Sequence, residues 1–212
     1  GYGWDMTIGG PKISVSNPLG KNWGTELRQT FGVPLYYWHE EHPHEVYIDW
    51  GNGETEIFSL VLDPEKTMSP YNWMDISAYF INKTGNGDTL EILDEHEGLI
   101  YAENSLFYAN MQAFDPQYFL LTRPDGMKYY FTKEFGLFKV EDTYGRTITL
   151  SINGIEYSEG GSVTFNRDGE GKITSISDGI NTVSYTYDAN GDLISVNDIG
   201  GYDTSFAYDN GH

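Results

Sequence analysis

Apolar and polar side chains alternate in short runs along most of this chain, and turn-forming residues interrupt the runs. Residues 46–58 show the pattern most clearly, since Val46, Ile48 and Trp50 fall on one face of an extended segment. A Gly-Asn-Gly turn follows them, where a positive φ costs little. Because a period of two is typical of half-buried strands, the pattern predicts consecutive antiparallel hairpins and no βαβ units.

The segment over residues 63–79 departs from this pattern. Its Asp-Pro and Ser-Pro pairs are turn or helix-start signals, and we expect a short helix near residues 70–79. Elsewhere the β pattern continues. The pattern predicts a short strand that contains Ile13 and Val15. It also predicts strands within residues 80–93, 99–111, 118–131 (with a turn at 124–126) and 137–152 (a hairpin around 142–145).

A self-similarity with a 20-residue period runs through the C-terminal part of the chain. Residues 163–178 match residues 183–198 at aspartate, glycine, aliphatic and serine positions, and a third copy begins at Ser205. Each copy predicts a strand, a tight turn and a return strand, so neighbouring copies must stack to bury their apolar faces. The expected structural positions are Phe165, Asp168, Gly171, Asp178, Tyr185, Tyr187, Asp188, Gly191, Asp198, Tyr208, Asp209 and Gly211.

The return strand of each copy has an irregular apolar spacing. Leu193 and Val196 lie three positions apart, so strict alternation would put them on opposite faces of the sheet. We therefore expect a β-bulge between them, or burial on both faces. Before this strand, Asp188 and Asn190 are suited to side-chain-to-backbone bonds that close a turn.

The repeat resembles the YD repeat of RHS-repeat proteins, on the run Tyr-Asp-Ala-Asn-Gly-Asp-Leu-Ile-Ser-Val-Asn-Asp at residues 187–198. Residues 123–131, 136–142 and 145–150 resemble the stretch that leads into the repeats of that family, and the opening Gly-Tyr-Gly-Trp resembles the start of that stretch. The resemblance implies an all-β fold of consecutive antiparallel hairpins in a curved or spiral sheet, with little helix.

The same resemblance implies three regions. Residues 1–117 are expected to form a Trp-rich lead-in or cap, residues 118–162 degenerate repeat hairpins, and residues 163–212 about two YD repeats and a truncated third. Because the chain begins with Gly1 instead of Met, we expect it to be part of a longer protein.

The resemblance also implies a role. RHS relatives wind YD hairpins into a hollow shell, which encloses a C-terminal effector in bacterial toxins and serves display and adhesion in cell-surface proteins. We therefore expect a secreted or cell-surface scaffold segment, most simply bacterial, whose partners are the rest of its own chain and an encapsulated effector or a surface glycan. Nothing matches the family's aspartyl self-cleavage centre, so we expect no catalysis. The alternative is a carbohydrate- or surface-binding adhesion module in residues 1–117.

Charge and composition narrow these classes further. The chain has 32 acidic and 12 basic residues, a net charge of −20, which argues against binding to nucleic acid or to anionic lipid. It has no cysteine, which excludes thiol catalysis and Cys-zinc sites. No apolar run approaches the roughly 18 residues of a membrane helix, so we expect no membrane insertion. Aromatic residues make up 16% of the chain, which favours strands.

Three histidines, His39, His42 and His44, form the one histidine cluster. Their spacing is not His-Glu-x-x-His, and Pro43 would disrupt the helix that such a motif requires. On a strand, His42 and His44 share a face and could bind a divalent metal with a neighbouring glutamate. The alternative is a solvated polar loop.

The run Asp188, Asn190 and Asp192 matches the first half of an EF-hand loop. The match fails where a glycine and a glutamate are needed, because Leu193 and Ile199 stand there. A looser calcium site and a plain turn are the two remaining interpretations, and we expect no other cofactor.

Tryptophans are confined to the first part of the chain, and we considered two interpretations of them. With acidic and Asn side chains nearby they could form a glycan platform, or they could pack in the core, as the phase of Trp50 suggests. The chain has no Gly-x-Ser-x-Gly motif of a serine nucleophile. The candidate platform residues are Trp4, Trp23, Trp38 and Trp73.

Overall fold

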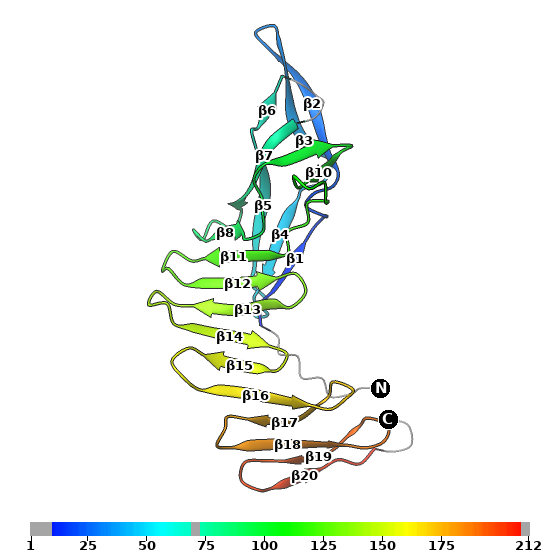
Figure 1. Ribbon diagram of the computed structural model, residues 1–212, viewed down its shortest axis with the longest axis vertical. Helices are drawn as coiled ribbons and strands as arrows, with labels where there is room; N and C mark the ends of the chain where they lie inside the picture. The colour runs from blue at the N-terminus through cyan, green and yellow to red at the C-terminus, as the bar shows by residue number, and fades with distance from the viewer. Residues whose placement is uncertain (1–9, 69–72, 209–212) are drawn as a thin grey trace. The chain divides into compact units, whose positions relative to one another are not determined.

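The computed structural model describes residues 10–68 and 73–208, and every regular element in these ranges is a β-strand (Figure 1). The chain divides into two compact units, which we call the lead-in unit (residues 10–143) and the repeat unit (residues 144–208). The strand pairs within each unit are antiparallel. The predicted all-β fold of antiparallel hairpins is therefore confirmed. The boundary lies after Thr143, whereas the sequence suggested boundaries after residues 117 and 162.

The lead-in unit contains a six-stranded sheet in the order β1-β4-β5-β7-β9-β10. The predicted hairpin over residues 46–58 is formed by β4 and β5, with Val46 opposite Phe58. Strand β5 alternates strictly between buried and less buried positions, as the period-two pattern requires. The strands are β1 (Lys12–Val15), β4 (Glu45–Asp49), β5 (Thr55–Asp63), β7 (Trp73–Asn82), β9 (Leu99–Ala102) and β10 (Ser105–Phe107).

Two further groups of strands complete the lead-in unit. One is the small sheet β2-β3-β6, and the other has the order β8-β11-β12-β13. Phe58, Phe119 and Phe131 are fully buried in this unit, and the rings of Phe80 and Phe119 lie 6.2 Å apart. The strands are β2 (Trp23–Thr30), β3 (Val33–Glu40), β6 (Lys66–Thr67), β8 (Thr89–Ile92), β11 (Tyr118–Thr122), β12 (Lys128–Thr132) and β13 (Gly136–Glu141).

The helix predicted near residues 70–79 is wrong. Residues 69–72 lie outside the described ranges, and β7 runs from Trp73 to Asn82. Ile76 and Ala78 are buried two positions apart, which is a strand period. Strand β7 also pairs with β5 over six residues, so the partner strand supplies the backbone hydrogen bonds that a helix would have formed internally.

The repeat unit is a meander in which each strand pairs with the next. The predicted bulge is present: Thr186 pairs with Ser195 and Tyr187 with Leu193, so Ile194 is the extra residue. Thr174 is the extra residue of the preceding copy. The strands are β14 (Thr147–Ser151), β15 (Gly154–Tyr157), β16 (Ser162–Arg167), β17 (Ile173–Ser177), β18 (Thr182–Tyr187), β19 (Leu193–Asn197) and β20 (Asp203–Ser205).

Candidate functional site

An aspartate closes each hairpin corner of the repeat. Asp188 Oδ1 accepts hydrogen bonds from the backbone N–H groups of Asn190 at 2.8 Å and Asp192 at 2.9 Å. Asp168 accepts two such bonds in the preceding copy, both at 2.9 Å. In the turns at the other ends of these strands, Asp178 and Asp198 also accept backbone hydrogen bonds and close the corners in a similar way. The aspartates of the repeat motif are therefore turn-forming residues.

These hydrogen bonds also affect ionisation. Donation from the Asp192 N–H to the carboxylate of Asp188 lowers the pKa of Asp188. Donation from the Asn181 N–H lowers the pKa of Asp178 in the same way. Because hydrogen bonds to a carboxylate favour its charged form, both aspartates stay ionised at neutral pH.

A second repeated feature joins each copy to the one before it. Tyr187 Oη donates to the carbonyl oxygen of Ile173 at 2.8 Å, and Tyr208 Oη donates to that of Leu193 at 2.7 Å. In the first copy the position of the tyrosine is occupied by Arg167, whose Nε donates to the carbonyl oxygen 15 residues earlier at 3.0 Å. We call these three bonds the cross-copy ladder.

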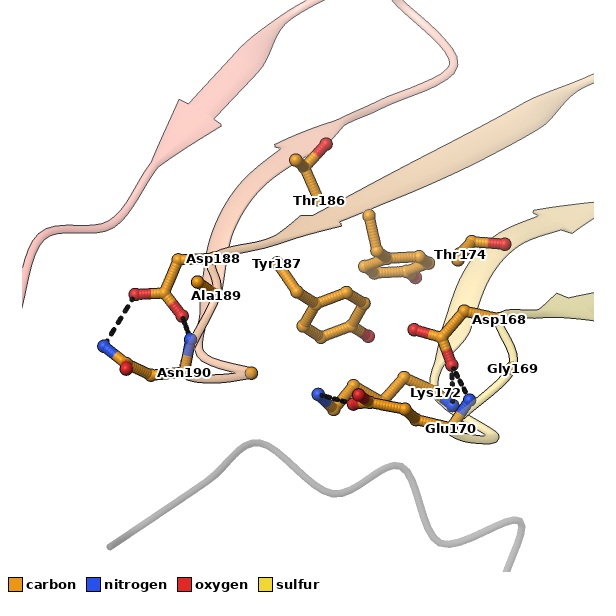
Figure 2. A pocket seen from close by; sticks show the side chains of 12 residues that line it. Asp168, Gly169, Glu170, Lys172, Thr174, Thr186, Tyr187, Asp188, Ala189 and Asn190 are labelled. Carbon is orange, nitrogen blue, oxygen red and sulfur yellow. Dashed lines mark hydrogen bonds and ion pairs between the residues drawn. The ribbon is translucent and has the colours of Figure 1, made fainter.

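The corners at Asp168 and Asp188 border an open groove of about 670 Å³ (Figure 2). Lys172 points into it, pairs with Glu170 at 2.8 Å, and lies 5.7 Å from the ring centre of Tyr187. The hydrogen bond with Glu170 raises the pKa of Lys172, and burial raises the pKa of Tyr187. The polar groups of the groove thus largely satisfy one another.

Gly191 adds a steric reason for the motif. Its φ is 87°, a conformation that residues with a Cβ rarely adopt, and a Cβ there would collide with Lys172. Gly171 has the same conformation in the preceding copy, at 86°. The third-copy residues Asp209 and Gly211 lie outside the described residues.

The structure does not favour the calcium site proposed at Asp188, Asn190 and Asp192. The Asp188 carboxylate already accepts backbone hydrogen bonds, and the Asn190 amide is directed at it at 3.5 Å. In residues 10–68 and 73–208, no three His, Asp or Glu side chains gather so as to hold a metal ion. The geometry is that of the plain turn.

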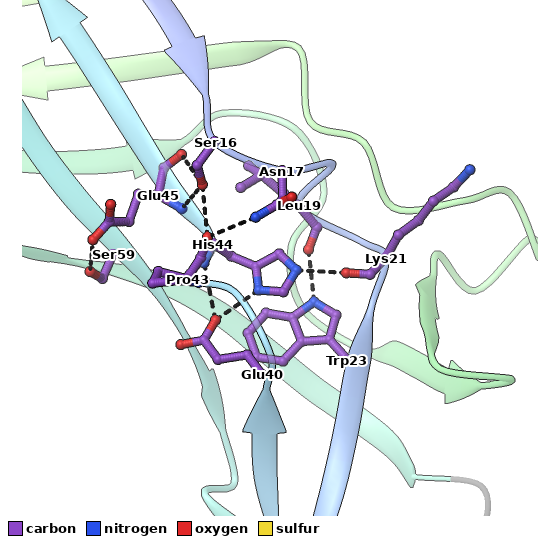
Figure 3. Close-up of polar contacts among 10 residues, drawn as sticks. All are labelled: Ser16, Asn17, Leu19, Lys21, Trp23, Glu40, Pro43, His44, Glu45 and Ser59. Carbon is purple, nitrogen blue, oxygen red and sulfur yellow. Dashed lines mark hydrogen bonds and ion pairs between the residues drawn. The ribbon is translucent and has the colours of Figure 1, made fainter.

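His44 is buried, with 1% of its surface exposed, and both of its ring nitrogens face acceptors (Figure 3). Nε2 lies 2.6 Å from the carbonyl oxygen of Lys21, and Nδ1 lies 2.8 Å from Glu40 Oε2. The same Glu40 oxygen accepts the backbone N–H of His44 at 3.0 Å. The ring also stacks on that of Trp23, with ring centres 4.2 Å apart.

The three histidines therefore do not form one site in the described structure. His44 precedes β4 in the interior, whereas His39 at the end of β3 and His42 before Pro43 are exposed. The expected shared strand face of His42 and His44 is absent because residues 41–44 lie between strands. His44 instead ties the loop between β3 and β4 to the end of β3, since it bonds to Glu40.

Among the described tryptophan side chains, Trp23 is buried, whereas Trp38 and Trp50 are partly exposed. Trp23 is 3% exposed and donates to the carbonyl oxygen of Leu19 at 2.9 Å. Trp38 donates to that of Pro64 at 2.9 Å and stands edge-on to Trp23 at 6.1 Å. These contacts favour the core interpretation over the glycan platform. Trp4 and the side chain of Trp73 lie outside the described part of the structure.

One further cluster, of charged side chains, was not predicted from the sequence. Glu56 and Asp88 are each 5% exposed, and Arg123 lies 3.8 Å from a carboxylate oxygen of both. Trp50 donates to Glu56 Oε1 at 2.7 Å. The available signal was Glu56 itself, a charged residue in phase with the buried Phe58 on β5.

The described residues contain no helix of the length and apolarity needed to cross a membrane. Comparison with known protein families finds no family model that matches the chain, and comparison with curated proteins finds no match. The geometry above is therefore the basis for a functional proposal.

Proposed function

We propose that this chain is a structural segment of an RHS/YD-repeat β-shell, a toxin-encapsulating or cell-surface scaffold, without catalysis of its own. The observation that carries the proposal is the cross-copy ladder. Arg167, Tyr187 and Tyr208 each bond to a carbonyl oxygen of the preceding copy. A side chain that serves its neighbour in every copy is what a stacked array requires.

Two further features support the same role. The aspartate corner and the bulged return strand recur at the period of the sequence repeat. The polar groups that line the groove between the corners form hydrogen bonds and ion pairs largely with one another. We therefore interpret the groove as a consequence of how the hairpins stack, and not as a reaction site. In this scaffold the rest of its own chain is the main partner, and an encapsulated effector or a surface glycan is the ligand of the whole assembly.

Strand β20 offers a place for continuation. It pairs with β19 on one side, and within the described residues no strand lies on its other side. An open edge presents unpaired backbone groups, to which a further hairpin of the same kind fits. We propose a secreted or cell-surface location, where such shells occur in RHS relatives.

The alternative, an adhesion module in residues 1–117, was predicted to bind through a platform of exposed tryptophans. Trp23 is buried, and Trp38 bonds to the backbone and packs edge-on to Trp23. The scaffold is therefore the function that we propose.

The test extends the array in register. Residues 204–209 match residues 183–188 at an offset of 21 residues, so replacing residues 210–212 with residues 189–209 extends the array by one 21-residue period. Each added copy should raise the melting temperature of the repeat unit, because it adds a stacking interface. The matched control carries the same 21 residues in scrambled order. An unchanged melting temperature on in-register extension would contradict the proposal.

A further inference from the structure

Two carboxyl groups and one guanidinium group from distant parts of the lead-in unit meet in its interior. Glu56 lies on β5, Asp88 precedes β8, and Arg123 follows β11. Glu56 and Asp88 are each 5% exposed. Strand β5 belongs to the six-stranded sheet, whereas β8 and β11 belong to the group β8-β11-β12-β13. The cluster therefore ties the six-stranded sheet to the group β8-β11-β12-β13.

Hydrogen bonding in this cluster is incomplete. Trp50 donates to Glu56 Oε1 at 2.7 Å, and the Asn86 amide donates to Asp88 Oδ2 at 3.0 Å. Arg123 lies 3.8 Å from each carboxylate, which is too long for a hydrogen bond. Glu56 Oε2 and Arg123 Nε are both buried without a hydrogen-bond partner. An unsatisfied buried oxygen of a carboxylate is costly and needs an explanation.

A proton supplies that explanation. Both carboxyl groups lie 3.8 Å from the same guanidinium group, and a side-chain hydrogen bond with Glu56 is among the causes that raise the pKa of Asp88. Two carboxylates in contact only repel each other, whereas one proton between them turns the contact into an O–H···O bond. That bond satisfies the oxygen of Glu56 that otherwise has no partner.

The position of Arg123 explains why it does not replace the proton. Its guanidinium lies over the ring of Trp50 at 4.4 Å and over that of Tyr129 at 5.1 Å. These stacking contacts compete with a closer approach to the carboxylates. The groups that face the pair are therefore the Arg123 guanidinium from the β11 side, the Asn86 amide from the turn, and the Trp50 N–H from the β4–β5 turn.

We propose that Glu56 and Asp88 share one proton and, with Arg123, form an acid-tightened clamp between the six-stranded sheet and the group β8-β11-β12-β13. In acid the shared proton bonds Asp88 to Glu56 and holds β5 to the turn before β8. Loss of the proton leaves two buried negative charges facing one guanidinium without a direct hydrogen bond, so the clamp weakens.

The direction of the pH effect follows from Asp88. Burial, then the hydrogen bond with Glu56 and its charge, raise the pKa of Asp88 from 3.8 to about 6, while Arg123 acts in the opposite direction. The folded form therefore binds this proton more tightly than the unfolded chain does. The resulting stabilisation is fully present below the unfolded value, and it is lost as the pH rises through about 6.

The first experiment follows the carboxyl carbons of the unaltered full chain by NMR as a function of pH. We expect the Asp88 carboxyl carbon to titrate with a midpoint near 6, and the chemical shift of the Glu56 carboxyl carbon to change in the same transition because the shared hydrogen bond is lost. Titration of Asp88 at its ordinary value of 3.8, with no linked change at Glu56, would overturn the proposal.

The second experiment compares urea unfolding of the wild type and Asp88→Asn at about pH 4.5 and about pH 7.5, on either side of the transition. The asparagine amide can donate to Glu56 at any pH, so the fall in the urea midpoint between the two pH values should be smaller in Asp88→Asn. Glu91→Gln, at an exposed position of β8, is the matched control and should keep the pH response of the wild type. An identical pH response in Asp88→Asn and the wild type would contradict the clamp.

Discussion

The lead-in unit and the repeat unit are both built from antiparallel hairpins, yet they bury side chains to different degrees. In the lead-in unit Phe58, Phe119 and Phe131 are completely buried. Among the described residues of the repeat unit, the most buried large apolar side chains still have 7–8% of their surface exposed. They are Phe165, Ile173 and Leu193.

The two units are therefore stabilised in different ways. The lead-in unit rests on burial of apolar surface in a shared interior. The repeat unit relies more on hydrogen bonds: the cross-copy ladder joins adjacent copies, and the aspartate corners close the turns within each copy. In such an array each copy depends on its neighbours, so the number of copies sets the stability. The predictions below test this comparison, beginning with the largest expected effect.

Phe119→Ala should destabilise the lead-in unit by about 3–5 kcal/mol, because it removes a fully buried ring and leaves a cavity. Hydrogen exchange read strand by strand is the measurement, and protection should fall in β11 and its neighbours β8 and β12. Tyr118→Ala is the control, since Tyr118 is 49% exposed and adjacent on the same strand. Equal effects of the two substitutions would show that burial does not dominate this unit.

Tyr187→Phe should destabilise the repeat unit by about 1 kcal/mol, the typical net contribution of one hydrogen bond. The substitution removes only the hydroxyl that bonds to the carbonyl oxygen of Ile173. The control is Tyr202→Phe, because Tyr202 is 75% exposed. Thermal melting followed by circular dichroism measures both variants. A loss for Tyr202→Phe as large as that for Tyr187→Phe would show that the ladder contributes nothing specific.

The difference between the units also explains what could be predicted from the sequence. The corner at Asp188 and the bulge between Leu193 and Val196 depend on residues a few positions apart, so the repeat pattern predicts them. The role of Arg167 in the cross-copy ladder was not predicted. An arginine stands there in place of the tyrosine of the later copies, although its side chain makes an equivalent hydrogen bond. Local spacing is thus sufficient where neighbouring copies repeat the same contacts.

In the lead-in unit the decisive contacts join distant residues. The prolines before Trp73 suggested a helix start, but pairing with β5 makes β7 a strand. The cluster of Glu56, Asp88 and Arg123 draws on three separate segments, and no local pattern brings them together. For His44 the sequence allowed a metal site or a solvated polar loop. Neither predicts its burial, because that burial depends on Trp23 and Lys21, which are distant in sequence.

Acid should affect the two units in opposite directions. The pKa of Asp88 in the lead-in unit is raised, so its contribution to stability grows as the pH falls through about 6. The pKa of Asp188 in the repeat unit is lowered by the hydrogen bond from the Asp192 N–H. A lowered value means that the contribution of Asp188 is present above the unfolded pKa of 3.8 and is lost as the pH falls through the folded value.

Asp188→Asn provides the smallest and most specific test of that difference. Asparagine keeps an oxygen that can accept the backbone N–H groups of Asn190 and Asp192, but it cannot titrate. At neutral pH the variant should lose little stability, and below about pH 4 the protection of β18 and β19 from hydrogen exchange should depend less on pH than in the wild type. Asp203→Asn is the control, because Asp203 is exposed and its carboxylate accepts a hydrogen bond from the Asn197 side chain. If β18 and β19 of Asp188→Asn lose protection in acid as steeply as the wild type, the corner carboxylate is not what makes the repeat unit acid-sensitive.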